Sequence, residues 1–392
     1  MTVRANRMAD SGDRGPGPRV AVVGLGAAGL AAAWSAAQRG CHVIGYDQAD
    51  LDNQPASSGG RGKIIRFGYD DPFYANLMLD TLPRWEALGR QTGRTLMRRD
   101  GGLHLGEPDD VATVAGAIRS AGQPYDLVEH GDPRLDAFGI ALAPGATAVY
   151  EPSAGIMDTT QTRMALAEAA TAAGAVLRDH TEVTDVAPTG AGLRIRTHEG
   201  IDDFDRVIVA GGPWAFRLVP DAATAFDITR RFQLVWRTDA PLGDGRARPW
   251  MDYAGAGYYG MINVATADGG AIHIAGLHQH DREQHVADPS EPDDPTFRAA
   301  SVTEVGDVVA TRFGLPAQPD VVDVRACHYT STETTDFVID GCPGLPGAVL
   351  LSACSGHGFK FTITTGAYAA ALAVDGHLPH PERFRLGLAS RT

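Results

Sequence analysis

The amino-acid sequence predicts an α/β fold in which a Rossmann-type nucleotide-binding domain is interleaved with an α+β domain built on an antiparallel sheet. A buried-strand pattern at Val20–Val23 leads through a glycine-rich turn into an alanine-rich helix. Similar strand-and-helix patterning returns in the middle of the chain and at its C-terminal end. From Arg231 to about Arg325, aromatic and glycine-rich runs indicate strands of a second domain.

Composition limits the classes of function. A chain of 392 residues can bury one large core or two coupled cores. Its net charge of −14 argues against nucleic acid as a partner, because phosphates require a basic face. No apolar stretch is long enough to cross a bilayer, and Met1–Pro18 lacks the apolar centre of a signal peptide. We therefore expect a cytoplasmic protein with no membrane contact.

The elements follow in order from local patterns. Residues 1–17 are polar and unpatterned, which predicts a disordered leader. The fold begins at Arg19, and the alanine-rich helix ends near Gln38. The acidic, proline-bearing stretch Asp281–Pro295 predicts a surface loop. Further strands are predicted at Cys41–Asp47, Leu193–Thr197, Arg206–Ala210 and Ala348–Ala353, and further helices at about Thr160–Ala173 and Phe361–Val374.

This order predicts how the chain divides between two domains. Residues 18–95, 155–235 and 322–392 are assigned to the nucleotide-binding domain. Residues 96–154 and 236–321 are assigned to the substrate domain.

The nucleotide site is predicted at a G-x-G-x-x-G motif formed by Gly24, Gly26 and Gly29, with Asp47 at the end of the next strand. The glycines allow a tight turn and close approach of a pyrophosphate, and the acid can accept from a ribose hydroxyl. The motif alone fits both NAD and FAD. Its position at the N-terminus, and the return of strand-and-helix patterning far along the chain, favour FAD.

Lysine and cysteine are both sparse. Only two lysines, Lys63 and Lys360, occur among the 34 Lys and Arg residues, and both lie in glycine-rich segments. A lysine is a compact cation with an adjustable pKa, so we expect a specific role for both. The four cysteines stand singly, without the spacing of a metal site or a disulfide framework, so no metal is expected.

Four separated segments carry a resemblance to a known family: Gly62–Tyr69, Gly257–Gly260, Cys327–Thr330 and Cys354–Phe361. In this order they resemble the amine-oxidising flavoenzymes of the D-amino-acid oxidase superfamily, most closely the monomeric sarcosine oxidase, N-methyltryptophan oxidase and pipecolate oxidase family. The resemblance extends from about Arg19 to about Pro381. It implies FAD as the cofactor and a monomeric enzyme.

The resemblance also implies how FAD is held. Cys327 is similar to the family's cysteine that forms a thioether to the flavin, a reaction that requires a thiolate. Cys41, Cys342 and Cys354 are expected to be structural. Backbone N–H groups of the turn containing Gly356, His357, Gly358 and Lys360 are expected to face the flavin edge that becomes negative on reduction.

The resemblance implies roles for several side chains around the substrate. Lys360 and Arg66 would bind a substrate carboxylate. Tyr259 and Tyr329 would line the pocket, and His278 would lie beside the amine. Asp71 falls where the family has an acid on a mobile lid.

One departure from the family pattern concerns oxygen. The oxidases have a lysine two residues before the glycine of the strand that precedes His278. Counting from Gly276, the residue here is Ile274, and the neighbouring His273 is expected on the other face of the strand. Lys63 stands where the family has an arginine. We therefore hypothesise that Lys63 partly supplies the cation that promotes electron transfer to O2.

The function implied is oxidation of the C–N bond of a secondary amine or amino acid. Hydride would pass to flavin N5, an imine would form, and O2 would reoxidise the flavin to give hydrogen peroxide. The departure at Ile274 favours, as an alternative, a dehydrogenase that uses another electron acceptor. A flavin- or NAD-binding module without turnover is a third interpretation, which the set of Arg66, Lys360, Tyr259 and Tyr329 argues against.

Overall fold

The structure is a computed structural model. It describes residues 17–51, 57–255, 257–266, 269–278, 284–315 and 317–387. Residues 1–16 of the predicted leader, and part of the predicted loop at residues 281–295, lie outside the described residues.

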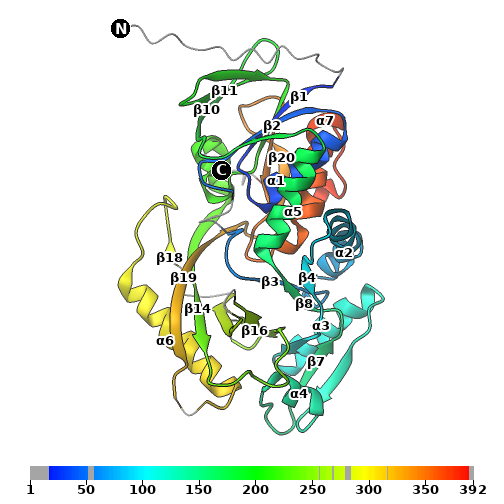
Figure 1. Ribbon diagram of the computed structural model, residues 1–392, viewed down its shortest axis with the longest axis vertical. Helices are drawn as coiled ribbons and strands as arrows, with labels where there is room; N and C mark the ends of the chain where they lie inside the picture. Colours follow the sequence, from blue (N-terminus) through cyan, green and yellow to red (C-terminus); the bar gives the residue numbers. More distant parts are fainter. Residues whose placement is uncertain are drawn as a thin grey trace.

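A six-stranded sheet forms the centre of the upper half of the molecule (Figure 1). Its strands pair in the order β20-β21-β13-β1-β2-β9, and all are parallel except β20. Segments far apart in the sequence therefore complete one sheet, as predicted. The strands are β1 (Arg19–Val23), β2 (His42–Tyr46), β9 (Val176–Arg178), β13 (Arg206–Val209), β20 (Val338–Gly341) and β21 (Ala348–Ser352).

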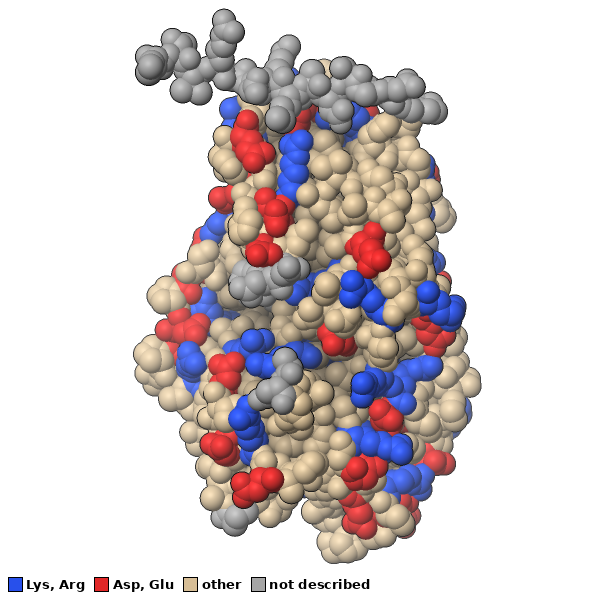
Figure 2. All heavy atoms as spheres, viewed as in Figure 1, with Lys and Arg blue, Asp and Glu red and all other residues tan. Residues whose placement is uncertain are grey.

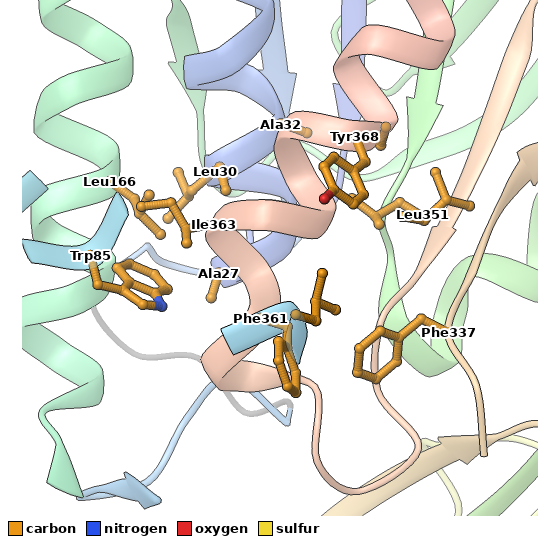
Figure 3. Close-up of a cluster of buried hydrophobic side chains, with 14 of the residues drawn as sticks. Ala27, Leu30, Ala32, Trp85, Leu166, Phe337, Leu351, Phe361, Ile363 and Tyr368 are labelled. Carbon is orange, nitrogen blue, oxygen red and sulfur yellow. The ribbon is translucent and has the colours of Figure 1, made fainter. Parts of the chain in front are cut away.

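Three helices pack together beside this sheet: α1 (Ala27–Gln38), α5 (Thr159–Ala172) and α7 (Thr362–Asp375). Figure 3 shows their contact, with Leu30 of α1, Leu166 of α5 and Ile363 of α7 close to Trp85 of α2 (Pro72–Thr92). Small residues let α1 and α7 approach closely. A Cβ atom on Gly366 of α7 would lie 2.6 Å from the Cβ of Ala31.

The second large sheet is mainly antiparallel and occupies the lower half of Figure 1. Its strands pair in the order β18-β14-β17-β16-β15-β5-β7-β6, with β19 also pairing with β14. The strands are β5 (Gly102–Leu105), β6 (Asp126–Glu129), β7 (Thr147–Glu151), β14 (Asp227–Arg237), β15 (Arg248–Asp252), β16 (Tyr258–Ala265), β17 (Ala271–Leu277), β18 (Gln284–His285) and β19 (Asp320–Ser331).

The segment from Arg231 to Arg325 does not form strands throughout, which corrects one prediction. Helix α6 (Pro295–Arg312) interrupts it and packs on β14 and β17. Asp294 caps this helix by accepting from the amides of Thr296 and Phe297. Four valines and three threonines fall within α6, and such β-branched residues give it a composition typical of strands.

Smaller elements join these layers. A three-stranded sheet pairs in the order β3 (Lys63–Ile65), β8 (Gly155–Met157) and β4 (Met97–Arg98), and another contains β10 (Val183–Pro188), β11 (Leu193–Thr197) and β12 (Ile201–Phe204). The remaining helices are α3 (Pro108–Ser120), α4 (Pro133–Phe138), α8 (Pro381–Phe384), η1 (Gly212–Arg217), η2 (Pro220–Ala225) and η3 (Phe359–Phe361). The residue boundaries of the two domains stay a prediction.

The surface carries both signs of charge. On the face in Figure 2, acidic and basic side chains are interspersed. Among the described residues, no helix combines the length and apolar character needed to span a bilayer.

We predict that Gly366→Ala destabilises the protein by about 2 kcal/mol, because the added methyl group overpacks the α1–α7 contact. Gly116→Ala is the matched control, since a Cβ atom on this glycine of α3 has no heavy atom within 4 Å. The control should stabilise the protein by about 0.5 kcal/mol through helix propensity. Urea unfolding of both variants measures the difference, and equal effects would contradict the packing argument.

Candidate active site

One cavity extends from the glycine-rich turn after β1 to the strands of the antiparallel sheet. The residues predicted to be catalytic or to bind the cofactor all line it except Gly29, and Asp71 does not line it either. Gly29 instead lies where a side chain would overlap the carbonyl oxygen of Gly24, so it allows close packing of α1 on the turn. The lining residues predicted from the sequence are Gly24, Gly26, Asp47, Lys63, Arg66, Tyr259, His278, Cys327, Tyr329, Gly356, His357, Gly358 and Lys360.

The glycine-rich turn has the geometry of a dinucleotide site. Gly24 has a φ of +91°, and a Cβ atom there would lie 2.6 Å from the carbonyl oxygen of Ala210. The carboxylate of Asp47 accepts from the amide of Leu25 at 2.7 Å, which holds it beside the turn. Ser58 lines the same end of the cavity and accepts from the amide of Ala27, at the start of α1.

Cys327 lies on β19, and its half-buried side chain is near Lys63. Burial raises the pKa of the Cys327 thiol, and the charge of Lys63 opposes this shift. Burial lowers the pKa of Lys63 in turn, and Cys327 and Cys354 oppose that shift. Cys354, which we expected to be only structural, lines the cavity and interacts with the same lysine.

Arg66 and Lys360 meet at the ring of Tyr69. The guanidinium carbon of Arg66 lies 4.2 Å from the ring centroid, and the Lys360 ammonium donates to the Tyr69 hydroxyl at 2.7 Å. Both cations are almost fully buried, with exposed fractions of 8% and 5%. Burial opposes the charge of Arg66, yet Tyr253, Tyr69 and Glu151 hold its pKa above the usual value. Burial and the neighbouring Arg66 lower the pKa of Lys360.

Tyr259, Tyr329 and His278 form an aromatic group around one end of the cavity. The His278 ring lies edge-on to Tyr259 at 6.4 Å and to Tyr329 at 6.0 Å between centroids. The Tyr259 oxygen accepts from Gln233 at 2.7 Å. Burial and the nearby cations Arg66, Lys360 and Arg231 lower the pKa of His278 to about 3, so its imidazole is neutral at physiological pH.

Strand register puts Ile274 on the same face of the sheet as Tyr259. Ile274 pairs with Met261 and Val235, and Gly276 pairs with Tyr259. The side chain of Ile274 is buried in an apolar cluster with both of its partners. His273 lies on the opposite face, against Trp236. The position at which the oxidases carry a lysine is therefore apolar.

The turn between β21 and η3 is stabilised by hydrogen bonds between its own backbone groups. The N–H groups of His357 and Gly358 both donate to the carbonyl oxygen of Cys354, at 3.0 and 2.9 Å. These two amides therefore have partners inside the turn rather than at the flavin edge that we expected. Lys360 donates to the carbonyl oxygen of His357 at 3.0 Å, which ties its side chain to the same turn.

The resemblance implies a position on a mobile lid for Asp71, whereas here its side chain contacts α2 and α8. It caps α2 by accepting from the amide of Phe73 at 2.8 Å. It also forms an ion pair at 2.6 Å with Arg383 of α8.

Three site residues have no motif in the sequence: His104 of β5, Glu151 of β7 and Tyr253, which follows β15. They form a chain of hydrogen bonds that ends at Arg66, and Tyr253 also lines the cavity. Tyr253 lies shortly before the segment Gly257–Gly260 that carries the family resemblance. His104 and Glu151 stand 47 positions apart, so only their pairing in the fold brings them together.

These features define a dinucleotide-binding protein whose cavity joins the nucleotide turn to a polar, aromatic-lined chamber. Residues 19–372 match the DAO family, described as FAD dependent oxidoreductase, and the chain belongs to this family. It is an FAD-dependent oxidoreductase of the amino acid oxidase type, which acts on amines or amino acids. The glycine turn and Asp47 fit the dinucleotide part of FAD, because only backbone atoms approach closely there.

Two curated relatives are similar over nearly their whole length. The monomeric sarcosine oxidase of Streptomyces avermitilis is 31% identical, over 92% of this chain and 95% of its own. The N-methyl-L-tryptophan oxidase of Yersinia pestis is 28% identical, over 91% of this chain and 95% of its own.

Solved structures share the fold. NikD, an unusual amino acid oxidase essential for nikkomycin biosynthesis, is 23% identical and superposes with a TM-score of 0.81 over 93% of this chain and 96% of its own. The L-proline dehydrogenase of P. horikoshii is 19% identical, with a TM-score of 0.78 over 94% of this chain and 96% of its own.

Proposed function

We propose that this enzyme oxidises the C–N bond of a secondary amine or amino acid that carries a carboxylate, giving an imine. FAD, when bound, supplies the two-electron acceptor at N5, and O2 takes up the electrons to give hydrogen peroxide. The observation that carries the proposal is the buried pair of basic side chains, Arg66 and Lys360, which both contact Tyr69. Two such side chains at one cavity favour an anionic ligand such as a carboxylate.

The remaining pocket residues suit a neutral amine. His278 is neutral because burial and three nearby cations lower its pKa. The oxygen of Tyr259 accepts from Gln233, so its own proton can donate toward the chamber. The positive surroundings disfavour an ammonium ion and favour the unprotonated amine, which is the form that can be oxidised.

The neighbourhood of Cys327 supports covalent attachment of FAD. The thiolate is the reactive form of cysteine, and a nearby cation stabilises it. Lys63 is the cation that opposes the effect of burial most strongly at Cys327. Lys63 would therefore have two roles: to stabilise the Cys327 thiolate and to promote electron transfer to O2.

The identity of the electron acceptor rests on Lys63 and Ile274. The apolar cluster around Ile274 supplies no charge on its side of the cavity. Lys63 lines the same cavity, and we propose that its ammonium partly stabilises the negative charge that develops on O2. A dehydrogenase that uses a carrier or quinone is the second candidate, favoured by the replacement at Ile274.

The proposed reaction is tested by anaerobic mixing of the holoenzyme with N-methyl, cyclic and aromatic amino acids. We predict that at least one of them bleaches the flavin absorbance, while the matched amine without a carboxylate does so about tenfold less efficiently. No bleaching by any carboxylate-bearing amine would contradict the proposal. Comparing turnover with O2 and with a dye acceptor then separates oxidase from dehydrogenase.

Lys63→Met should slow reoxidation of the reduced flavin by O2 by about tenfold, because one cation near developing charge is lost. Reduction by substrate should change much less. Arg61→Met, which removes an exposed cation two residues away, is the control. Stopped-flow reoxidation measures both variants, and an unchanged rate for Lys63→Met would show that the lysine has no such role.

Cys327→Ser should release the flavin when the protein is precipitated with acid, whereas the parent protein should stay yellow. Cys354→Ser removes the neighbouring thiol in the same cavity and should retain the colour. Release of the flavin from the parent protein, or from Cys354→Ser alone, would disprove attachment at Cys327.

A further inference from the structure

We propose that Glu151, His104 and Tyr253 form a positioning chain that orients the Arg66 guanidinium for binding of the substrate carboxylate. This inference rests on the proposed function, since it concerns how the carboxylate site is built. His104 and Glu151 were not expected from the sequence.

The chain is continuous from a buried carboxylate to the guanidinium. Glu151 Oε2 lies 2.9 Å from His104 Nε2, and His104 Nδ1 lies 3.1 Å from the Tyr253 oxygen. The same oxygen lies 3.1 Å from Nη1 of Arg66. The His104 and Tyr253 rings are stacked at an interplanar angle of 10°, so packing also fixes their relative orientation.

Hydrogen-bond chemistry gives this chain one direction. An ionised carboxylate can only accept, so His104 Nε2 donates to Glu151. Burial lowers the pKa of His104 although Glu151 opposes the shift, so the imidazole is neutral and its Nδ1 accepts from the Tyr253 hydroxyl. The Tyr253 oxygen then has lone pairs free to accept from Arg66. Each hydrogen bond in the chain therefore has one defined donor and one defined acceptor.

Glu151 is anchored to the backbone that carries Arg66. Its carboxylate accepts from the amides of Phe67 and Gly68 at 2.7 and 2.9 Å, and from the Ser153 hydroxyl at 2.9 Å. Burial alone would raise the pKa of Glu151, but His104 and these donors hold it below the usual value. A side chain at position 68 would overlap the His104 ring, so the close approach requires a glycine.

The contacts thus close a ring. The backbone after Arg66 binds Glu151, and the Arg66 side chain binds Tyr253 at the other end of the chain. The three residues therefore hold both the backbone that follows Arg66 and the guanidinium of its side chain. A flexible arginine side chain loses conformational entropy when it binds a ligand. Because these contacts already order Arg66 before the ligand arrives, binding costs less entropy.

The chain also preserves the charge that a substrate needs. Tyr253 is a neutral acceptor, so it orients Arg66 without cancelling its charge. The negative charge of Glu151 acts on both Arg66 and Lys360 through space, while two neutral side chains lie between its carboxylate and the guanidinium in the hydrogen-bond chain. A carboxylate paired directly with Arg66 would instead compete with the substrate for the same N–H groups.

The test is the affinity of the holoenzyme for propionate, a carboxylate without an amine, measured by isothermal titration calorimetry. Tyr253→Phe removes only the hydroxyl, and we expect binding about tenfold weaker. Tyr368→Phe is the matched control, because it removes a hydroxyl that bonds to Asp80 away from the cavity, at 3.2 Å. The control should bind propionate as the parent protein does, and thermal unfolding verifies that both variants are folded.

Two further measurements separate positioning from a general structural effect. In the Tyr253→Phe variant, KM for a reactive amino acid should rise about tenfold with kcat nearly unchanged. In an Arg66→Met background, the Tyr253→Phe substitution should have no further effect on propionate binding, because the residue acts through Arg66.

The outcomes are distinguishable. If Arg66→Met binds propionate as well as the parent protein, the proposed carboxylate site is wrong. If Arg66→Met weakens binding but Tyr253→Phe does not, the carboxylate site stands and the positioning chain is overturned.

Discussion

Two buried cations, Arg66 and Lys360, share one enclosed chamber, and much of the surrounding structure is arranged to hold them there. Burying a charge without partners is expensive, and two like charges side by side are more so. Tyr69 relieves part of this cost, since its ring faces Arg66 and its hydroxyl accepts from Lys360. Glu151 supplies the negative charge that acts on both cations. Asp70 also acts on Arg66, and the two basic side chains together suit an anionic ligand.

The interleaved topology explains how these groups come together. Arg66 and Tyr69 follow β3, Glu151 ends β7, and Lys360 lies in η3 beyond the last parallel strand. No continuous segment of the chain contains the site. The antiparallel sheet contributes Tyr259, Cys327 and Tyr329 on the face that lines the cavity, while its other face packs against α6. The site is therefore a product of the contact between the two sheets.

Motifs predicted most of this site, and their limits are physical. The glycine turn and Asp47 have a local pattern that nucleotide binding requires, and the segments around Arg66, Cys327 and Lys360 were located by their resemblance to a family; all of these line the cavity. Glu151 and His104 act through neighbours on adjacent strands, and a single sequence carries no signal for such pairing.

Helix α6 was missed although its sequence does contain local helix signals. Its capping residue and a proline at its start were visible as Asp294 and Pro295, but its β-branched residues matched a strand composition.

The two lysines of the chain meet different physical demands. Lys360 is held by Tyr69 and the His357 carbonyl group in a fixed position. Lys63 lies beside two thiols, where a cation of adjustable pKa can favour a thiolate. Arginine is always charged, so it would lack the adjustable pKa that lysine has at these positions. Arg66 by contrast faces a planar carboxylate in the proposed complex, where two parallel N–H donors are an advantage.

The central claim is that Arg66 and Lys360 bind the substrate carboxylate while Tyr253 holds Arg66. A crystal structure of the holoenzyme with propionate bound tests it most directly. We predict carboxylate oxygens at about 2.8 Å from both Arg66 and Lys360, with the Tyr253 oxygen still accepting from Arg66. A carboxylate bound elsewhere, or an Arg66 side chain turned away from Tyr253 in that complex, would contradict the account.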